Sequence, residues 1–300
     1  AGFGRLVSAA YVEILWHAQS GYNAVFWRRV FWEWGARIVA GVVVAALVFA
    51  NLRIVSGTLN GVQIKRRFGN LEISEQLPKS YVFWAMTGTS ALLGLWFGGS
   101  ITPSLGRLLL LIRNSEAWGI VEPMLNHDVG FYVFWVPALL QLVIYALVVT
   151  FLVFTLSTAG YAATGALSWG HGRVEAQEPT RLHLGALLGL FLVLMGVRLW
   201  LSRFELLLDG TSDVRGIFGF ADAEARLPAM QTLSIICVVS GVAAFWGAWK
   251  NRGAMMASAL MAVVLAMVTI GQLYPSLIQS LRVEPNELER ETPFIESNLE

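Results

Sequence analysis

Cysteine and charge are scarce in this sequence. Cys237 is the one cysteine among 300 residues, which excludes intrachain disulfides and multi-cysteine metal sites; we interpret it as a small buried apolar residue. Charged residues make up 14% of the chain, against about 25% in ordinary soluble domains. The net charge of +1 includes no concentrated basic stripe, which argues against nucleic acid as a partner.

Motifs of catalysis and cofactor binding are also missing. The sequence contains no nucleophile elbow, no phosphate-cradling loop and no dinucleotide fingerprint. The four histidines lack metal-ligand spacing: His17, His127, His171 and His183. His127-Asp128 could contribute two metal ligands, but no third lies nearby in sequence, so we interpret the pair as structuring its loop. The sequence therefore predicts a non-enzymatic chain without catalytic, cofactor-binding or metal residues.

What the sequence does contain is long apolar runs. About 20 mostly apolar residues span the hydrocarbon core as a helix, and lipid offers no partner to an unpaired backbone amide. Six runs meet that length: 31–52, 81–101, 131–159, 182–201, 229–249 and 254–273. The predicted fold is an all-α, polytopic transmembrane helix bundle. We expect antiparallel neighbours, small-residue contacts, Trp and Tyr at both interfaces, and no significant β-sheet.

The connecting segments sort into two sets on opposite sides of the membrane. Segments 53–80, 164–181 and 250–253 carry net charges of +3, 0 and +2, whereas 102–129, 202–227 and 282–300 carry −1, −2 and −4. Lys and Arg number nine in the first set and seven in the second, to which Arg5, Arg28 and Arg29 add three. The net charges favour a cytoplasmic first set and an acidic tail outside the cytoplasm, although the positive-inside rule counts Lys and Arg alone.

Some segments outside the runs have features of their own. Residues 1–30, rich in Tyr and Trp, are typical of an interfacial helix or of the outer end of a span, and 108–112 is too short to cross. We expect Pro275 to end the sixth helix and Pro285-Asn286 to open a polar helix. The transmembrane domain is thus predicted over 1–281, and the start of a soluble, extracytoplasmic region over 282–300. A first residue that is not Met further suggests a piece of a longer polypeptide.

Ionisable residues within the runs are few. Glu33 and Arg37 share one helical face, four residues apart, which predicts a local ion pair. Arg198 lies about one turn from the polar boundary at Arg203, so we expect its side chain to extend towards the headgroups. No run carries Asp, Glu or His at mid-depth, which argues against a proton-driven transporter.

Several blocks resemble landmarks of uncharacterised protein family 0182, a family of large multi-span bacterial membrane proteins. The blocks are Gly21–Trp27, Glu122-Pro123 with Asp128–Phe134 and Pro137, Arg203–Leu207, Phe220–Ala223 with Arg226–Ala229, Tyr274-Pro275 with Gln279, and Val283–Glu291 with Pro293–Glu296. Leu125-Asn126 and Phe220-Ala221 depart from the family pattern. The resemblance implies about seven spans, one of them before Ala1, and a large extracytoplasmic domain after Glu300. It also implies a place in the inner membrane of a bacterium. It implies no reaction.

Three functions are compatible with this pattern. The first is a non-enzymatic anchor or accessory subunit whose loops dock a soluble domain or other subunits of a membrane complex. The second is a transporter or lipid-handling protein, which predicts a polar cavity near Glu33, Arg37 or Arg198. The third is an envelope enzyme whose active site lies outside these residues. Membrane lipids are the one partner common to all three.

Overall fold

The computed structural model describes residues 2–58, 63–68, 71–76, 78–100, 105–170, 173–208 and 218–299. Helices dominate this part of the chain, which confirms the predicted all-α class. The long helices are α2 (Asn23–Ser56), α3 (Lys79–Ser100), α5 (Val136–Ala163), α6 (Glu178–Leu208), α7 (Leu227–Trp249) and α8 (Gly253–Ala266). Within the described residues, five continuous helical segments are long and apolar enough to cross a membrane. A sixth crossing is possible if α3 and the short α4 (Leu105–Arg113) are taken together as one bent segment.

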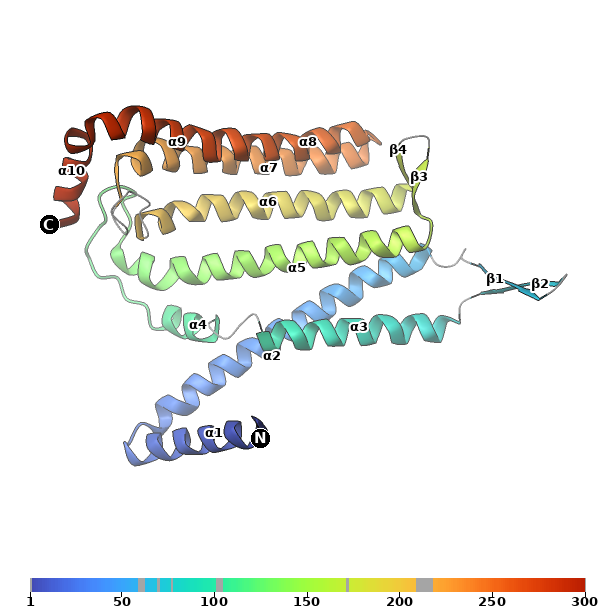
Figure 1. Cartoon of the computed structure of the whole chain (residues 1–300). Coiled ribbons are helices and arrows are strands. Elements are labelled where there is room, and N and C mark those ends of the chain that lie inside the picture. Colours follow the sequence, from blue (N-terminus) through green and yellow to red (C-terminus); the bar gives the residue numbers. More distant parts are fainter. Residues whose placement is uncertain are drawn as a thin grey trace.

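The long helices lie side by side, with α2 inclined across the others (Figure 1). Each packs mainly on its neighbour in the series α3, α2, α5, α6, α7, α8, while α4 packs on α2 and α5. The helix α1 (Gly2–Gln19) folds back beside the start of α2 after a turn in which Gly21 has a φ of +80°. Large apolar side chains remain exposed along α2, α3 and α7, as expected for helices surrounded by lipid.

Small residues set the contact between α6 and α7. A Cβ added at Gly189 would lie 2.8 Å from the carbonyl oxygen of Gly241, and one added at Gly196 would lie 2.8 Å from that of Ser234. The Ser234 hydroxyl donates a hydrogen bond to the Gly196 carbonyl at 2.8 Å. The two backbones therefore approach closely, as predicted for helix packing in lipid.

Prolines are accommodated inside the helices by π turns. Four π segments, 131–135, 222–226, 267–273 and 279–283, each end two residues before a proline: Pro137, Pro228, Pro275 and Pro285. The residue before each proline donates its N–H to the carbonyl five residues earlier. Since proline lacks an amide hydrogen and crowds the carbonyl four residues back, the wider turn relieves both problems.

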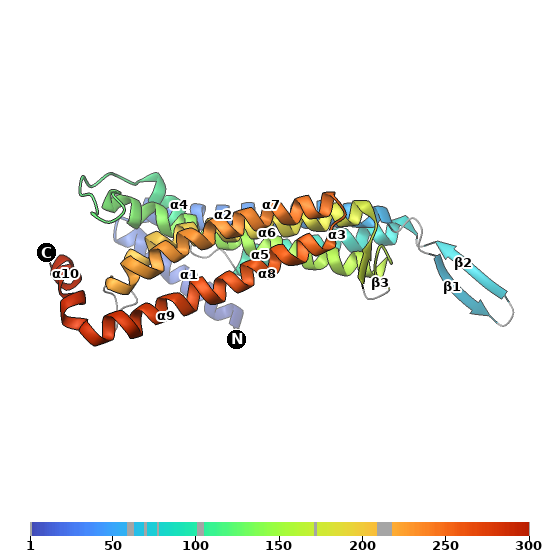
Figure 2. The same ribbon diagram turned by 90° about the horizontal axis from the view of Figure 1, so that it is seen from above.

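Because of these π turns, the prediction that Pro275 ends the sixth helix is wrong. After α8, the helix continues through α9 (Tyr274–Ile278) and a 3₁₀ turn (Glu284–Asn286) into α10 (Glu287–Leu299). The expected polar helix after Pro285 is present as α10, although it continues from the preceding turns. It bends away from α9 at one end of the bundle (Figures 1 and 2).

The connections contain two β-hairpins that the sequence did not predict. Strands β1 (Gln63–Phe68) and β2 (Leu71–Gln76) pair antiparallel, as do β3 (Leu167–Gly170) and β4 (Arg173–Ala176). Both hairpins and the tight α7–α8 turn lie at one end of the bundle, and α4 and α10 lie at the other (Figure 1). The predicted sorting of connections into two sides is thus confirmed, without showing which side is cytoplasmic.

Candidate functional site

The landmark blocks of the loops gather at the end of the bundle opposite the hairpins. We call this the landmark end and define it as residues 114–130, 203–208, 218–226 and 284–296. The opposite hairpin end comprises residues 51–58, 161–170, 173–183 and 248–253. The landmark end is made of two polar modules, each closed by carboxylates that accept hydrogen bonds from backbone amides.

Asp128 closes the first module. Its carboxylate accepts hydrogen bonds from the backbone N–H of Trp118 at 3.1 Å, Gly119 at 2.7 Å and Gly130 at 2.7 Å. These bonds, that from Trp118 first, lower the pKa of Asp128 from its usual value. The interpretation that Asp128 structures its loop is therefore supported by geometry.

Glu122 closes the same module on its other side. Its carboxylate accepts from the N–H groups of Met124 at 2.6 Å and Leu125 at 2.8 Å, and from the Tyr132 hydroxyl at 3.0 Å. Asn126 follows with a φ of 60°, which turns the chain back so that the Glu122 N–H donates to the His127 carbonyl at 2.9 Å. The loop is thus attached to the first turn of the third span.

Aromatic rings hold this loop on α6. His127, Phe131 and Tyr132 surround Phe204, with ring centroids 5.1 to 5.8 Å from that of Phe204. Phe204 is buried near the end of α6, and the Arg203 guanidinium next to it stacks on Trp200 at 3.5 Å. Two blocks far apart in sequence therefore form one cluster.

The second module joins the start of α7 to α10. Asp222 is 1% exposed and forms an ion pair with Arg226 at 2.7 Å. The Glu291 carboxylate on α10 accepts from the Phe220 N–H at 3.2 and 3.3 Å. Phe294, also on α10, has its ring centroid 6.3 Å from that of Phe220. The bend of α10 is thus fixed by contacts with the segment before α7.

Arg198 points towards this end, as expected. Its guanidinium binds the Glu205 carboxylate at 2.8 Å and also contacts the Ser202 hydroxyl. This pair lies along α6 and satisfies the arginine without a ligand.

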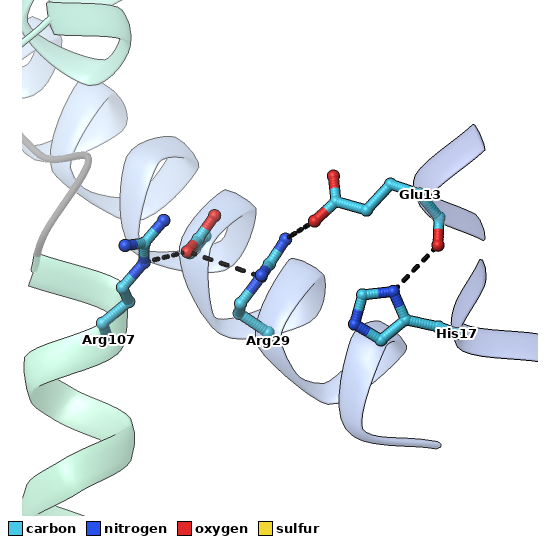
Figure 3. A network of polar contacts seen from close by, with 5 residues as sticks. Glu13, His17, Arg29 and Arg107 are labelled. Atoms are coloured by element: carbon cyan, nitrogen blue, oxygen red, sulfur yellow. Dashed lines mark hydrogen bonds and ion pairs between the residues drawn. The ribbon is translucent and has the colours of Figure 1, made fainter. Parts of the chain in front are cut away.

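Glu33 and Arg37 do not pair with each other, contrary to the local-spacing prediction. Glu33 binds Arg107 of α4 at 2.5 Å and lies 3.9 Å from Arg29, which also pairs with Glu13 of α1 (Figure 3). The approach of α4 is allowed by Gly106, where a Cβ would lie 2.5 Å from the Glu33 Cα. The network therefore ties α1, α2 and α4 together.

A polar chain at the hairpin end escaped the sequence reasoning. The Tyr161 hydroxyl lies 2.8 Å from His183 Nδ1, and His183 Nε2 lies 2.8 Å from the Asn51 Oδ1. These residues come from α5, α6 and α2. The available signal was a histidine near the start of a predicted span, but its partners are more than 20 and 130 positions away.

Metal-ligating residues do not cluster in the described part of the chain. Among residues 2–58, 63–68, 71–76, 78–100, 105–170, 173–208 and 218–299, no three His, Cys, Asp or Glu side chains come together in a way that could hold a metal ion. His171 lies outside the described residues. Four carboxylates of the landmark end are engaged in folding its loops: those of Glu122, Asp128, Asp222 and Glu291.

Comparison with known proteins gives a family and no activity. The model of the uncharacterised protein family UPF0182 matches residues 2–300. UPF0182 proteins of Geobacter sp. (strain M21) and Kocuria rhizophila are 29% and 30% identical over 96% of this chain. The match covers 32% and 29% of those relatives, so the chain spans about a third of their length. No solved structure matches. The chain belongs to the uncharacterised protein family UPF0182.

Proposed function

We propose that this chain is the non-enzymatic membrane anchor of a longer protein in a bacterial inner membrane. Its landmark end would dock a soluble region that continues from α10 on the extracytoplasmic side. The relatives are about three times as long as the matched part, which leaves room for such a region. The net charges of the connections, which are negative at the landmark end, favour this orientation.

An exposed apolar patch on the first module is the observation that carries this proposal. Trp118, Ile120, Val121 and Met124 are 50, 64, 54 and 46% exposed on a loop outside the predicted spans. The loop backbone around them is fixed by Asp128 and Glu122. Apolar side chains presented together on a rigid polar loop are typical of a surface that another protein segment covers.

The path of α10 supports the choice of occupant. Glu291 and Phe294 hold α10 against the second module, so the chain leaves the bundle at the landmark end. A region that follows α10 starts at the same end of the bundle as the connection between α4 and α5, which carries the patch (Figure 1). Tethering of this kind raises its effective concentration there.

Cysteine labelling in two reagent sizes tests the docking. Ile120→Cys in the intact protein would be treated, in permeabilised membranes, with a small maleimide and with a polyethylene-glycol maleimide. We expect the small reagent to react readily and the large one several-fold more slowly, because the docked region covers the patch. Arg252→Cys at the exposed α7–α8 turn is the control and should react with both; the buried Cys237 should react with neither.

Equal labelling of both sites by the large reagent would contradict docking. The same variants report the orientation in intact cells. A membrane-impermeant maleimide should label Ile120→Cys and leave Arg252→Cys unmodified; the reverse pattern would place the landmark end in the cytoplasm.

A further inference from the structure

A groove of about 510 Å³ runs between α2 and α3, away from the landmark modules. Its floor is glycine: Gly41, Gly94 and Gly98 bring the two backbones together, and a Cβ added at Gly94 would lie 2.6 Å from the Gly41 carbonyl oxygen. Its sides include Ile38, Val42, Ala91 and Leu95. The groove is therefore apolar along its length and open towards the surroundings of the two helices.

Arg37 lines one end of this groove. Its guanidinium lies 5.2 Å from the Trp34 ring centroid, and its Nε is shielded from solvent without a hydrogen-bond partner in the described part of the chain. Within the described residues, the ion pairs nearby use Arg29, Glu33 and Arg107 and leave Arg37 out. A positive charge at the end of an apolar channel is thus left without a protein anion.

Arg37 lies towards one end of the membrane-crossing part of α2. From Arg37 to Ser56 the helix is about 29 Å long. Because α2 is inclined across the other helices (Figure 1), it spans less depth than the roughly 30 Å of a hydrocarbon core, so the long Arg37 side chain extends outwards to reach the headgroup layer. Trp34 lies one turn further out, where aromatic rings favour the headgroup layer. The groove runs from Arg37 towards Ala45, about 12 Å along α2 and into the bilayer.

We propose that the groove between α2 and α3 binds one anionic phospholipid. The phosphate would accept hydrogen bonds from Arg37, and one acyl chain would lie on the glycine floor between Ile38 and Leu95. A net negative headgroup is favoured over a zwitterionic one, since the Arg37 charge has no other counter-ion among the described residues. This site is independent of the docking function.

Native mass spectrometry of the intact, delipidated protein tests the site. Dioleoyl phosphatidylglycerol and dioleoyl phosphatidylcholine would be added at matched concentrations. We expect the first lipid to be retained about fivefold more strongly than the second, and Arg37→Gln to remove this preference. Arg113→Gln is the matched control, because Arg113 also stacks on a tryptophan, Trp32, but does not line the groove.

A second variant fills the groove and keeps the charge. Ala91 is exposed on the groove wall, so Ala91→Phe should block the acyl chain and reduce retention of both lipids without disturbing the glycine contact. Leu92→Phe, on the exposed surface of the same helix, should behave as wild type. Equal retention of the two lipids by the wild-type protein, or an unchanged preference in Arg37→Gln, would overturn the proposal; if Arg37→Gln does not fold, unchanged retention in Ala91→Phe would overturn it.

Discussion

The two ends of the bundle are stabilised by different chemistry. At the landmark end, carboxylates of Asp128, Glu122 and Glu291 accept hydrogen bonds from backbone amides, and buried Asp222 pairs with Arg226. At the hairpin end, a neutral chain links three helices. The Asn51 amide donates to the Leu47 carbonyl at 2.7 Å, so its Oδ1 accepts from His183 Nε2, and His183 Nδ1 accepts from the Tyr161 hydroxyl.

This difference shows how each end fits its surroundings. The neutral chain lies where spans pack together, and it satisfies every polar atom without burying a charge. The charged modules lie beyond the predicted apolar runs, on the connections at the landmark end. They fold short loops into a fixed surface, which a docking site requires. Protonation and charge removal should therefore affect the landmark end more than the hairpin end.

Removing one cationic partner of a buried carboxylate should have the largest effect. Arg226→Met removes the Arg226 guanidinium from the Asp222 carboxylate and should destabilise the protein by about 2–3 kcal/mol. A lower thermal unfolding midpoint, followed by intrinsic fluorescence in detergent, would report it. Arg290→Met, which removes a cation 5.3 Å from the Phe220 ring, should cost less than about 1 kcal/mol. Equal midpoints for the two variants would refute the importance of the Asp222 pair.

Breaking the neutral chain should have an intermediate effect. Tyr161→Phe removes the donor to His183 Nδ1 within a buried contact and should cost about 1–2 kcal/mol. The matched control is Tyr145→Phe, whose hydroxyl donates at 2.9 Å to the Ala40 carbonyl of α2. The Ala40 carbonyl lies inside α2, so the free energy of unfolding should fall less in Tyr145→Phe than in Tyr161→Phe. If Tyr145→Phe is the more destabilised variant in thermal unfolding, the chain is not a specific feature of the hairpin end.

Acid should loosen the first module. The folded-state pKa of Asp128 is below its usual value of about 4, so its stabilisation is present above that value and is lost as the pH falls through the lowered pKa. Hydrogen exchange, corrected for its intrinsic pH dependence, should show the Trp118, Gly119 and Gly130 amides losing protection on acidification. The β3–β4 strands of the hairpin end should change less. Asp128→Asn should be loosened already at neutral pH, and constant protection of the three wild-type amides in acid would rule the mechanism out.

The smallest effect is expected from neutralising Glu291. Glu291→Gln keeps an acceptor for the Phe220 N–H but loses the charge that strengthens the bond. Exchange of the Phe220 amide should accelerate a few-fold, with little change in the unfolding midpoint. Glu289→Gln, an exposed neighbour on α10, should leave that amide unchanged. If both variants accelerate exchange of the Phe220 amide equally, the bend of α10 depends on the net charge of the helix and not on the contact between Glu291 and Phe220.

Length and hydropathy predicted the spans because a bilayer leaves little choice of structure for an apolar run. The predicted 131–159 and 182–201 runs lie within the helical segments 131–163 and 178–208. The connections alternate between the two ends of the bundle for the same reason, because each apolar run has to cross the bilayer. The β-hairpins could not be predicted, since strands of only four to six residues are too short for an alternating pattern to stand out from a loop.

Side-chain pairing was harder to predict because it depends on tertiary contacts. Helical spacing predicts an ion pair between Glu33 and Arg37. Because Gly106 allows α4 to approach α2 closely, Glu33 instead pairs with Arg107, which is 74 positions further along the chain. The helix through Pro275 was missed because the π turn that accommodates it depends on a backbone bond to the fifth residue back. The landmark carboxylates were found through family resemblance, and their role as loop-closing acceptors became evident in the structure.

Photo-crosslinking tests the docking role of the landmark end most directly. A photoreactive amino acid would replace Ile120 in the intact protein in its native membrane, and Arg252 in a parallel control. We predict crosslinks from position 120 to a defined peptide of the soluble region that follows α10, and none from position 252 to that peptide. Crosslinks from position 120 to lipid alone, or the same peptide captured from both ends, would contradict the account.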